Sequence, residues 1–515
     1  MAPHREIELK LDVKRDTLPR LEASSLLTND EAVSKSIPSV YFDTDRFDLR
    51  DAGLSLRVRE VEGTYVQTIK ANTFGNPMVR GEWEQRIKGP TPDLAVAHDT
   101  PLRRVLKDTD APVKPIFETC VQRTVRRLKR AGSTIEVALD KGEIRTPDGN
   151  APLCELELEL KEGRPRELFE LARKLNKSAP LLVSVKSKAE RGYALLEGEG
   201  PKFEKALPVH ILPNSPAGQA FQLIARVCIR QILANRTGML AGDAEALHQM
   251  RIGLRRLRTA ISLFDEIVAD DRREAVKRDL KWITEELGPP RDLDVLQTEV
   301  LDPLLKIMPR ETDSAGVRKE FKLRRQRAHE AAAHSIESDR FIASVLAMVE
   351  WVEAGPWTSV SDPLIRLRRE FPVDRYAADE LARRRKKIRK QGKHLSTLST
   401  KKRHKLRIRA KKLRYASEFF EDVFPGKKNK RHRKSAVEAL KNLQSALGEL
   451  NDVAARERLM SEVAKQKPVS GVRHPRNLSF AAGIVYGTQE TRVCELLAEA
   501  KKAHAKFEEI KAFWK

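Results

Sequence analysis

Charged and apolar residues alternate near the N-terminus, in the segment Glu6-Ile7-Glu8-Leu9-Lys10. Side chains two apart on a β-strand point to the same face, so both carboxylates and the ammonium group would share one face. Carboxylate oxygens are ligands for Mg²⁺ or Mn²⁺, and Lys or Arg side chains bind phosphate oxygens. The segment therefore predicts a strand whose charged face binds a metal ion together with a polyanion.

The same alternation recurs in four later segments, as far as residue 161. The residues that share a face in these segments are Arg57 and Arg59; Arg80, Glu82 and Glu84; Glu136, Ala138 and Asp140; and Glu155, Glu157 and Glu159. A single strand of this kind is usually the solvated face of a sheet, which needs only polarity. Several strands that combine both signs of charge favour a shared site for metal ions and phosphate groups.

The strand pattern predicts an eight-stranded antiparallel β-barrel within residues 1–200. Strand-like segments span 5–13, 37–44, 53–61, 64–71, 79–87, 115–129, 133–145 and 152–161. Eight strands are enough to close a barrel. We expect Ile7, Leu9, Leu56 and Val58 to face outward, while the charged residues face a lumen. The helices expected to cover the outward face span 15–27, 100–108 and 166–177. Charges crowded in a lumen require each other or an ionic ligand, so we predict a ligand tunnel.

Charge divides the 515-residue chain into two parts, and its length predicts several domains. Residues 1–200 contain 34 Lys and Arg against 33 Asp and Glu, whereas the remaining residues contain 64 against 41. We expect a linker at 201–215 and an all-α domain at 216–515, giving an α+β multidomain protein. The basic excess of the second part requires an acidic partner, which is nucleic acid, inorganic polyphosphate or an anionic membrane.

The helical part contains an internal repeat with a shift of 156 residues. His248, Arg251, Arg255 and Arg258 correspond to His404, Arg407, Lys411 and Arg414. In a helix these spacings keep the four side chains within an arc of about 80°. The repeat predicts a duplicated helical bundle, and like charges along its seam repel each other unless an anion compensates them. The two His residues could be neutral hydrogen-bonding groups or cations that face the ligand.

The nature of this anion is constrained by composition. Aromatic residues are 5% of the chain and do not alternate with basic residues, which disfavours single-stranded nucleic acid. Basic runs at 383–387 and 427–431 could bind any phosphate chain through counterion release, or could be solvated surface.

The positions of the cysteines and the hydropathy of the chain indicate in which cellular compartment the protein is expected. The four cysteines lie far apart, without the spacing of a zinc site or a disulfide framework. The N-terminus has no basic-then-apolar leader, and no apolar run approaches the ~20 residues that span a bilayer. We expect a soluble, cytoplasmic protein.

Two sets of motifs resemble known families. The first set comprises Glu6-x-Glu8-x-Lys10, Tyr41-Phe42-Asp43-Thr44, Leu56-Arg57-Val58-Arg59, Lys70, Arg80-Gly81-Glu82-Trp83-Glu84, Asp140 and the Glu155–Glu159 run. In this order it resembles the CYTH family, also called triphosphate tunnel metalloenzymes. The His and Arg repeats resemble the CHAD family. The order of the two is similar to that of bacterial CYTH–CHAD proteins that resemble inorganic triphosphatases.

The CYTH resemblance implies metal-dependent hydrolysis of inorganic triphosphate to diphosphate and phosphate, with Mg²⁺ or Mn²⁺ as cofactor. It implies that Glu6, Glu8 and Lys10 are catalytic. The implied metal ligands are Glu6 and Glu8 with two of Glu155, Glu157 and Glu159. The implied substrate-binding residues are Lys10, Arg57, Arg59, Lys70, Arg80, Arg123 or Arg126, Lys186 or Lys188, and Arg191. The sequence has no Gly-rich phosphate loop and no nucleophile motif, so we predict direct attack by water.

The CHAD resemblance implies that the second domain binds inorganic polyphosphate and catalyses nothing, and it suggests association with polyphosphate granules. The implied binding residues are His248, Arg251, Arg255, Arg258, His404, Arg407, Lys411 and Arg414. Nucleic acid is a disfavoured partner, and no membrane partner is expected. The alternatives are an adenylate cyclase or nucleoside triphosphatase built on the same barrel, and a binder of polyphosphate or nucleic acid without catalytic activity.

Overall fold

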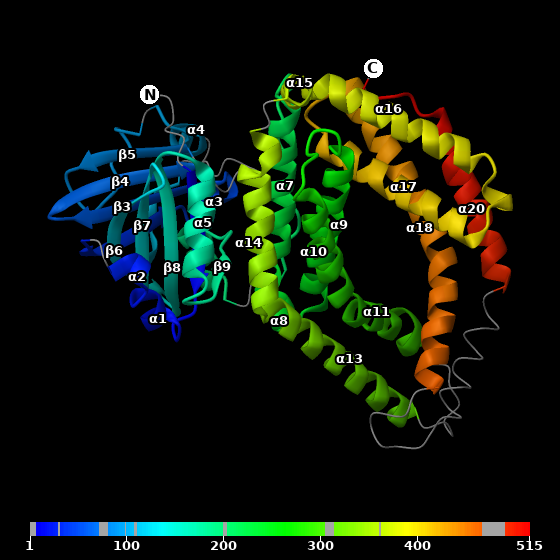
Figure 1. The fold of residues 1–515 in the computed structure, drawn as a ribbon, viewed down its shortest axis with the longest axis horizontal. Coiled ribbons are helices and arrows are strands. Elements are labelled where there is room, and N and C mark those ends of the chain that lie inside the picture. The colour runs from blue at the N-terminus through cyan, green and yellow to red at the C-terminus, as the bar shows by residue number, and fades with distance from the viewer. Residues whose placement is uncertain are drawn as a thin grey trace.

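An antiparallel sheet forms the N-terminal part of the protein, and helices form the rest (Figure 1). The computed structural model describes residues 7–28, 31–71, 81–97, 99–107, 111–198, 203–303, 314–359, 362–465 and 490–514. The predicted α+β class, with strands first and a purely helical second part, is confirmed.

The sheet contains the eight predicted strands and one short additional strand. The strands are β1 (Ile7–Val13), β2 (Val33–Asp43), β3 (Leu54–Val61), β4 (Thr64–Ala71), β5 (Gly81–Ile87), β6 (Lys114–Arg130), β7 (Ser133–Thr146), β8 (Gly149–Glu162) and β9 (Leu181–Val183). Their order is β5-β4-β3-β2-β6-β7-β8-β1-β9, and every neighbouring pair is antiparallel.

The predicted barrel-like tunnel is confirmed, although its sheet does not close among the described residues. Closure would require β5 to pair with the outer edge of β1. Part of that edge is already used, because β9 pairs with Leu11–Val13 and the N–H of Ser184 donates to the carbonyl of Lys10 (2.8 Å). The fold is therefore a barrel-like tunnel built from a wrapped, open sheet.

The convex face of the sheet carries the apolar half of the alternating pattern. Leu9 packs into a large buried core, and Leu56 and Val58 pack into a second one, as predicted. The helices that accompany the sheet are α1 (Leu18–Glu22), α2 (Ser25–Thr28), α3 (Asp48–Asp51), α4 (Pro101–Lys107), α5 (Pro165–Leu175) and α6 (Lys188–Leu196). Helix α5 covers β8, and its Phe169 is fully buried there.

The C-terminal part is built from helices alone. They are α7 (Ala217–Ala234), α8 (Arg236–Leu240), α9 (Ala244–Leu263), α10 (Arg273–Glu286), α11 (Gly288–Leu296), α13 (Ser314–Glu337), α14 (Asp339–Ala354), α15 (Pro363–Glu370), α16 (Val373–Gly392), α17 (Thr400–Phe419), α18 (Lys427–Lys465) and α20 (Glu490–Glu509). Short π and 3₁₀ segments at 297–301, 356–358 and 395–397 join some of them. Within the described chain, no helix combines the length and hydropathy needed to span a bilayer.

The predicted duplication is visible in the helix boundaries. Both ends of α9 map onto those of α17 with the shift of 156 residues, and the first residue of α7 maps onto that of α16. The two halves also exchange equivalent hydrogen bonds. The N–H of Ala217 donates to Phe371, and the N–H of Val373 donates to Ser215, each at 2.9 Å. These four residues are related by the same shift, so the halves meet across a local two-fold axis.

Helix α14 joins the helical part to the sheet, where it packs against α5 and β9 (Figure 1). Phe169 and Leu181 on the sheet side and Trp351 on α14 belong to one continuous buried core. The buried carboxylate of Glu350 accepts hydrogen bonds from Arg173 of α5 and from Arg272 (2.9 Å) of the helical part. The sheet and the helices therefore share both apolar and ionic contacts.

Candidate active site

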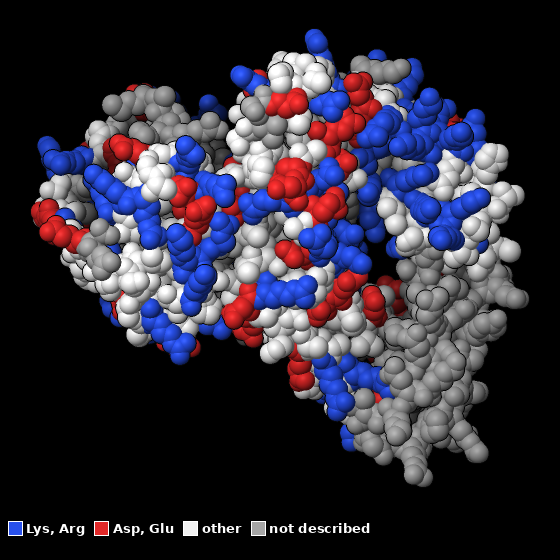
Figure 2. Space-filling view, viewed as in Figure 1, with Lys and Arg blue, Asp and Glu red and all other residues white. Residues whose placement is uncertain are grey.

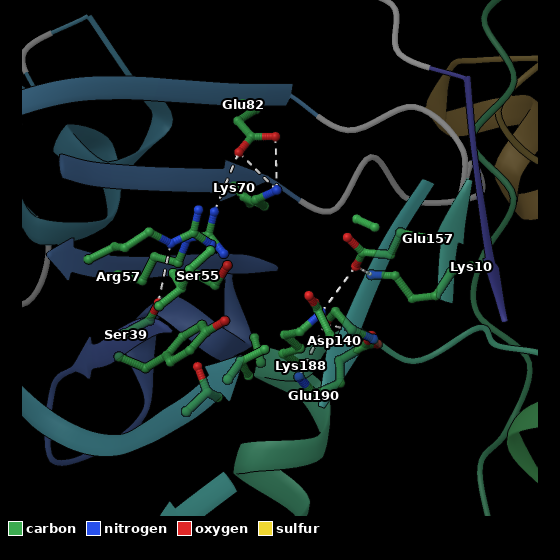
Figure 3. A pocket seen from close by; sticks show the side chains of 18 of the residues that line it. Lys10, Ser39, Ser55, Arg57, Lys70, Glu82, Asp140, Glu157, Lys188 and Glu190 are labelled. Atoms are coloured by element: carbon green, nitrogen blue, oxygen red, sulfur yellow. Dashed lines mark hydrogen bonds and ion pairs between the residues drawn. The ribbon is translucent and has the colours of Figure 1, made fainter. Parts of the chain in front are cut away.

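A polar cavity of about 250 Å³ lies in the concave face of the sheet (Figure 3). Side chains from the eight long strands and the first turn of α6 line it or lie directly behind it. Acidic residues of β1, β7 and β8 lie on one side, and cations of β3 and β4 lie on the other. This arrangement places the predicted charged face of each strand around one space.

Strand register brings the charged residues of β1, β8 and β7 into three rows. Each row takes one residue from β1, then one from β8, then one from β7. The rows are Glu8, Glu159 and Glu136; Lys10, Glu157 and Ala138; and Asp12, Glu155 and Asp140. Residues opposite each other in adjacent strands have neighbouring side chains. The rows therefore place carboxylates side by side along the cavity wall.

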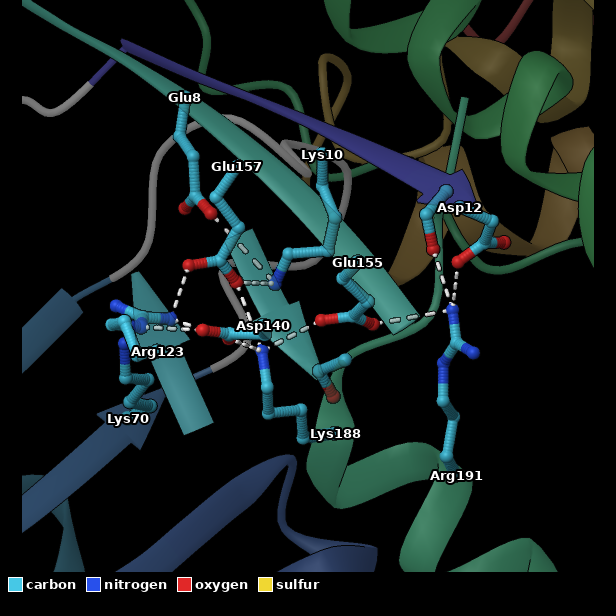
Figure 4. Close-up of polar contacts among 12 residues, drawn as sticks. Glu8, Lys10, Asp12, Lys70, Arg123, Asp140, Glu155, Glu157, Lys188 and Arg191 are labelled. Atoms are coloured by element: carbon cyan, nitrogen blue, oxygen red, sulfur yellow. Dashed lines mark hydrogen bonds and ion pairs between the residues drawn. The ribbon is translucent and has the colours of Figure 1, made fainter. Parts of the chain in front are cut away.

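The Lys188 ammonium group lies among three of these carboxylates (Figure 4). Its Nζ is 2.6 Å from Glu155, 2.8 Å from Asp140 and 3.0 Å from Glu157. One oxygen of each carboxylate lies within 4.8 Å of the others. Burial acts to lower the pKa of Lys188, but the three carboxylates outweigh it and raise this pKa well above its usual value.

Arg123 and Lys10 complete the ion pairs at the acidic end. Arg123 donates two hydrogen bonds to Asp140 (2.7 and 2.6 Å) and one to Glu157 (2.6 Å). The Nζ of Lys10 is 3.0 Å from Glu157. Burial acts to raise the pKa of Glu157, yet Lys10, Lys188 and Arg123 hold it well below its usual range. Glu157 is thus an ionised carboxylate shared by three cations.

The opposite wall carries cations that are only partly compensated. The Nη2 of Arg57 is 3.8 Å from Glu82, which is 2.8 Å from the Nζ of Lys70. Arg59 makes no ion pair with a described residue, and its Nε donates to Ser39 Oγ (3.3 Å). Burial, with repulsion from Arg57, lowers the pKa of Lys70 to about 8 and that of Arg59 to about 10. These groups are arranged to accept an anion.

The structure gathers most of the predicted tunnel residues. Those that line the cavity are Glu8, Lys10, Arg57, Arg59, Lys70, Arg123, Glu157, Glu159 and Lys188. Glu6 and Arg80 lie outside the described residues. Glu155 is fully buried behind the cavity, where Arg191 contacts it (3.2 Å) and also pairs with Asp12. Glu159 pairs with Lys161 (2.6 Å) at the cavity wall.

Two predicted residues lie elsewhere. Arg126 is opposite Val137, whose side chain belongs to the core on the convex face, so Arg126 does not reach the cavity. Lys186 pairs with Glu204 (2.6 Å) outside the cavity. Of the two pairs that the sequence left open, Arg123 and Lys188 are the members that line the cavity. Consecutive basic residues along β6 hide the parity that separates Arg123 from Arg126.

Several residues of the cavity were not among the predicted site residues. Asp140 and Glu136 carry the strand parity that marks them as inward-facing, and Asp140 accepts hydrogen bonds from Arg123 and pairs with Lys188. Helix α6 was not expected at all, although Ser187 and Glu190 have the spacing of a capping box, which the structure forms. This signal could have located the helix that carries Lys188 into the cavity.

The repeated basic residues of the helical part lie on α9 and α17. His248, Arg251 and Arg255 are partly buried, whereas Arg258 and His404 are exposed. Burial and the charge of Arg291 lower the pKa of His248 to about 4, so this imidazole is neutral near pH 7.

The two basic stripes approach each other. Burial lowers the pKa of Arg255, and Arg407 and Arg414 of the second repeat lower it further. Arg407 also passes over Gly448 of α18, where a Cβ atom would lie 3.0 Å from its guanidinium group. Arg414 donates to Glu418 (2.6 Å) and is thus partly compensated. Lys411 lies on the same stripe and is partly buried.

Comparison with known proteins identifies both parts. The sequence model of the CYTH domain matches residues 4–193, and that of the CHAD domain matches residues 223–461. An inorganic triphosphatase of Haemophilus influenzae is 30% identical over 198 residues, which are 37% of this chain and 55% of that protein. The chain thus matches about half the length of this relative.

Solved structures resemble each part separately. The CHAD domain from the plant Ricinus communis is 25% identical with a TM-score of 0.50, and the match covers 60% of this chain and 98% of that one. A putative adenylyl cyclase from Hippeastrum with a dominant triphosphatase activity is 18% identical with a TM-score of 0.28. That match covers 37% of this chain and 95% of the other.

The lowered pKa of Lys70 predicts a pH dependence of anion binding. With a pKa of about 8, Lys70 is charged below that pH and loses its charge as the pH rises through it. We expect the affinity of this cavity for a small polyanion, measured with inorganic triphosphate, to fall above about pH 8, because one cation of the cavity is lost. In Lys70→Arg, whose guanidinium group stays charged, this decline should be absent. An identical decline in both proteins would contradict the assignment to Lys70.

Proposed function

Because the chain consists of a CYTH domain followed by a CHAD domain, we propose that the first domain hydrolyses inorganic triphosphate to diphosphate and phosphate. The observation that carries this proposal is one cavity in which carboxylates outnumber cations along β1, β7 and β8, the acidic wall, while Arg57, Arg59 and Lys70, the basic wall, face them and are only partly balanced by Glu82 and Glu84. A triphosphate is a small polyanion that would complete the charge balance of Arg57, Arg59 and Lys70 without needing an apolar pocket.

The basic wall would bind and orient the substrate. Arg57 and Arg59 extend from β3, and Lys70 extends from β4, into the same space. The Nε of Arg57 is buried and makes no hydrogen bond with the described residues, so a donor is available to a phosphate oxygen. These cations would also offset the charge that develops on the departing diphosphate.

The acidic wall fits a divalent cation such as Mg²⁺ or Mn²⁺. Three carboxylates have oxygen atoms, hard ligands, within 4.8 Å of one another: Asp140, Glu155 and Glu157. The next row along the wall adds Glu8, which lies opposite Glu159. A bound divalent ion would polarise the terminal phosphoryl group and supply an activated water molecule. Lys188 now compensates these carboxylates, so the chain itself keeps the site charged and ordered before the ion binds.

We propose that water attacks the terminal phosphorus directly, without a phosphoenzyme. Neither His nor Cys lines the described cavity. The hydroxyl group of Ser39 accepts a hydrogen bond from Arg59, and Ser187 caps α6. The Ser187 hydroxyl group is held in this cap, since it donates to Glu190 Oε2 (2.9 Å) and accepts from the Glu190 N–H (3.1 Å). No His lines the described cavity to act as the general base of a serine nucleophile.

Replacement of the first two acidic residues tests the hydrolase proposal. We expect Glu6→Gln combined with Glu8→Gln to reduce phosphate release from triphosphate at least about 100-fold, because ionised metal ligands are lost. Products from triphosphate and from ATP should be separated by ion chromatography, with Mg²⁺ or Mn²⁺ added or chelated.

The matched control is Glu143→Gln, which removes a carboxylate of β7 that pairs with Arg145 (2.6 Å) outside the cavity. It should leave the rate unchanged. Unchanged hydrolysis in the double variant would contradict the proposal that the Glu6 and Glu8 carboxylates take part in the reaction. Cyclic AMP from ATP, without phosphate release from triphosphate, would instead identify a cyclase.

For the CHAD domain we propose binding of inorganic polyphosphate along the stripes of α9 and α17. Support comes from the packing of α9 against α17, which exposes Arg255 to the positive charge of Arg407 and Arg414; an anion bound along the stripes would offset this repulsion. The neutral state of His248 limits its role to hydrogen bonding until an anion raises its pKa.

Arg251→Gln combined with Arg255→Gln tests this assignment. We expect polyphosphate affinity at physiological salt to fall at least about tenfold, because two partly buried cations are lost, while triphosphate hydrolysis is retained. Lys281→Gln, an exposed change on α10, is the control. Competition with duplex DNA in the same buffer measures selectivity, and a preference for DNA would reject the polyphosphate proposal.

A further inference from the structure

A second basic surface lies apart from the stripes of α9 and α17, in a groove between α16, the start of α18 and the C-terminal segment. We call it the outer groove. It encloses about 910 Å³, and its lining includes Lys386, Lys390, Lys393, Lys428 and Lys511 but no carboxylate. Figure 2 shows Lys and Arg gathered at the upper right, the region where Figure 1 places α16 and α17. None of the four repeat residues of α17 lines this groove.

Residues of both basic runs of the sequence, 383–387 and 427–431, line the groove. Arg385 of the first run donates to the carbonyl groups of Ile510 and Glu508 (3.2 Å), and its guanidinium group lies 5.9 Å from the ring centroid of Trp514. These contacts hold the C-terminal segment against α16. They fix Lys511 beside the lysines of α16 and α18.

Positive charge in the outer groove is almost uncompensated. Arg389 is 3.4 Å from Glu508, but the five lysines form no ion pair with any residue of the described chain. Burial lowers the pKa of Arg385, and the nearby Arg389 lowers it further. A concave surface with one sign of charge concentrates anions.

The side chains indicate which anion fits. Lysine presents a mobile point charge and suits a flexible chain of charges rather than one fixed phosphate group. Base stacking would need a free aromatic face. The one Phe, Tyr or Trp residue in the described lining, Trp514, is partly exposed, packs edge-to-face at 84° against Phe513 with ring centroids 4.8 Å apart, and lies beside Arg385. A single such ring offers no series of faces on which successive bases could stack. A polymer of phosphates without bases therefore matches the groove better than nucleic acid does.

We propose that the outer groove is a second binding site for linear inorganic polyphosphate, separate from the stripes of α9 and α17. The choice of ligand rests on the proposed function of the CHAD domain, but the position of the site does not. The test is Lys386→Gln, Lys390→Gln and Lys393→Gln in one full-length protein. All three residues are exposed, and Gln has a helix propensity close to that of Lys.

Calorimetry with short-chain polyphosphate, with divalent ions chelated to prevent hydrolysis in the tunnel, should give one binding site fewer in the triple variant than in the unmodified protein. The slope of log affinity against log salt for long chains should fall by about two to three, because three cations no longer release counterions. The control Lys174→Gln, Lys177→Gln and Lys205→Gln removes equal charge from exposed positions on another part of the molecule.

The outcomes separate the two assignments. An unchanged number of sites and an unchanged slope in the triple variant would overturn the proposed site in the outer groove. Loss of one site in Arg251→Gln with Arg255→Gln, and of a different one in the triple variant, would support both assignments. Duplex DNA that displaces polyphosphate from the groove at equal phosphate concentration would overturn the proposed ligand.

The helical part also contacts the first turn of α6 directly, through Arg230. Arg230 of α7 donates to the carbonyl of Val185 (2.5 Å) and to Glu190 Oε1 (2.5 Å). Both acceptors belong to the CYTH part, and the Arg230 side chain is only 16% exposed. The helical domain thus forms hydrogen bonds with the CYTH part at the start of α6.

The same Glu190 carboxylate organises the first turn of α6. Its Oε2 accepts from the Ser187 N–H (2.8 Å) and Oγ (2.9 Å), and Ser187 Oγ accepts from the Glu190 N–H (3.1 Å). Lys188 follows directly, with its ammonium group among the three carboxylates of the tunnel. One carboxylate therefore connects Arg230 to the residue adjacent to Lys188.

We infer that Arg230 is a positioning residue for Lys188, so that hydrolysis in the tunnel depends on the helical domain. This inference rests on the proposed hydrolase function. We expect Arg230→Gln to reduce kcat about 10-fold to 100-fold, the usual effect of losing a group that orients a site, with KM nearly unchanged. Arg230→Lys should restore part of kcat.

The control is Arg173→Gln, which removes another ion pair between the domains but leaves Glu350 paired with Arg272. It should alter kcat little. A cycle with Glu190→Gln should be strongly non-additive, since both changes break one connection. An equal loss of kcat in Arg230→Gln and Arg173→Gln, or an additive cycle, would refute the inference. Activity in the unmodified protein shows separately whether the hydrolase proposal holds.

Discussion

Compensation of buried charge is the constraint on which the rest of this structure depends. The concave face of the sheet buries ionised groups of both signs, and such groups are stable only when paired. At the acidic wall the chain provides its own partners, as with Glu157 among Lys10, Arg123 and Lys188. At the basic wall the compensation is incomplete. The acidic wall is therefore compensated within the chain itself, while the basic wall keeps positive charge that Glu82 and Glu84 balance only in part.

The main strands could be predicted from the sequence because one physical pattern extends along each of them. A face of charges and a face of apolar residues give a period of two, which fixes strand position and orientation together. The open edge could not be predicted in this way. It follows from β9 and the Ser184 N–H, which occupy the edge of β1 through contacts distant in sequence. Short helices such as α3 and α6 lack a long periodic pattern and were missed for that reason.

Strand parity also predicted much of the candidate site, including Glu8, Lys10 and Arg57 at the cavity wall. Parity does not reveal which charges meet. The position of Lys188 among three carboxylates depends on the path of the chain from β9 into α6, and Arg123 could be separated from Arg126 only by the register with β7. The helical stripes were predicted by repetition, whereas the neutral state of His248 depends on burial and on Arg291 from another helix.

The reciprocal hydrogen bonds that link the start of α7 to the start of α16 have an evolutionary consequence. A lone ancestral half could have formed the same pair of bonds with an identical copy, as in an isologous homodimer. Gene fusion would then have released the two halves from identity while the shared contact kept them in register. The two halves now differ at equivalent positions. Lys411 stands where the first half has Arg255, and Arg414 pairs with Glu418 whereas its counterpart Arg258 is exposed.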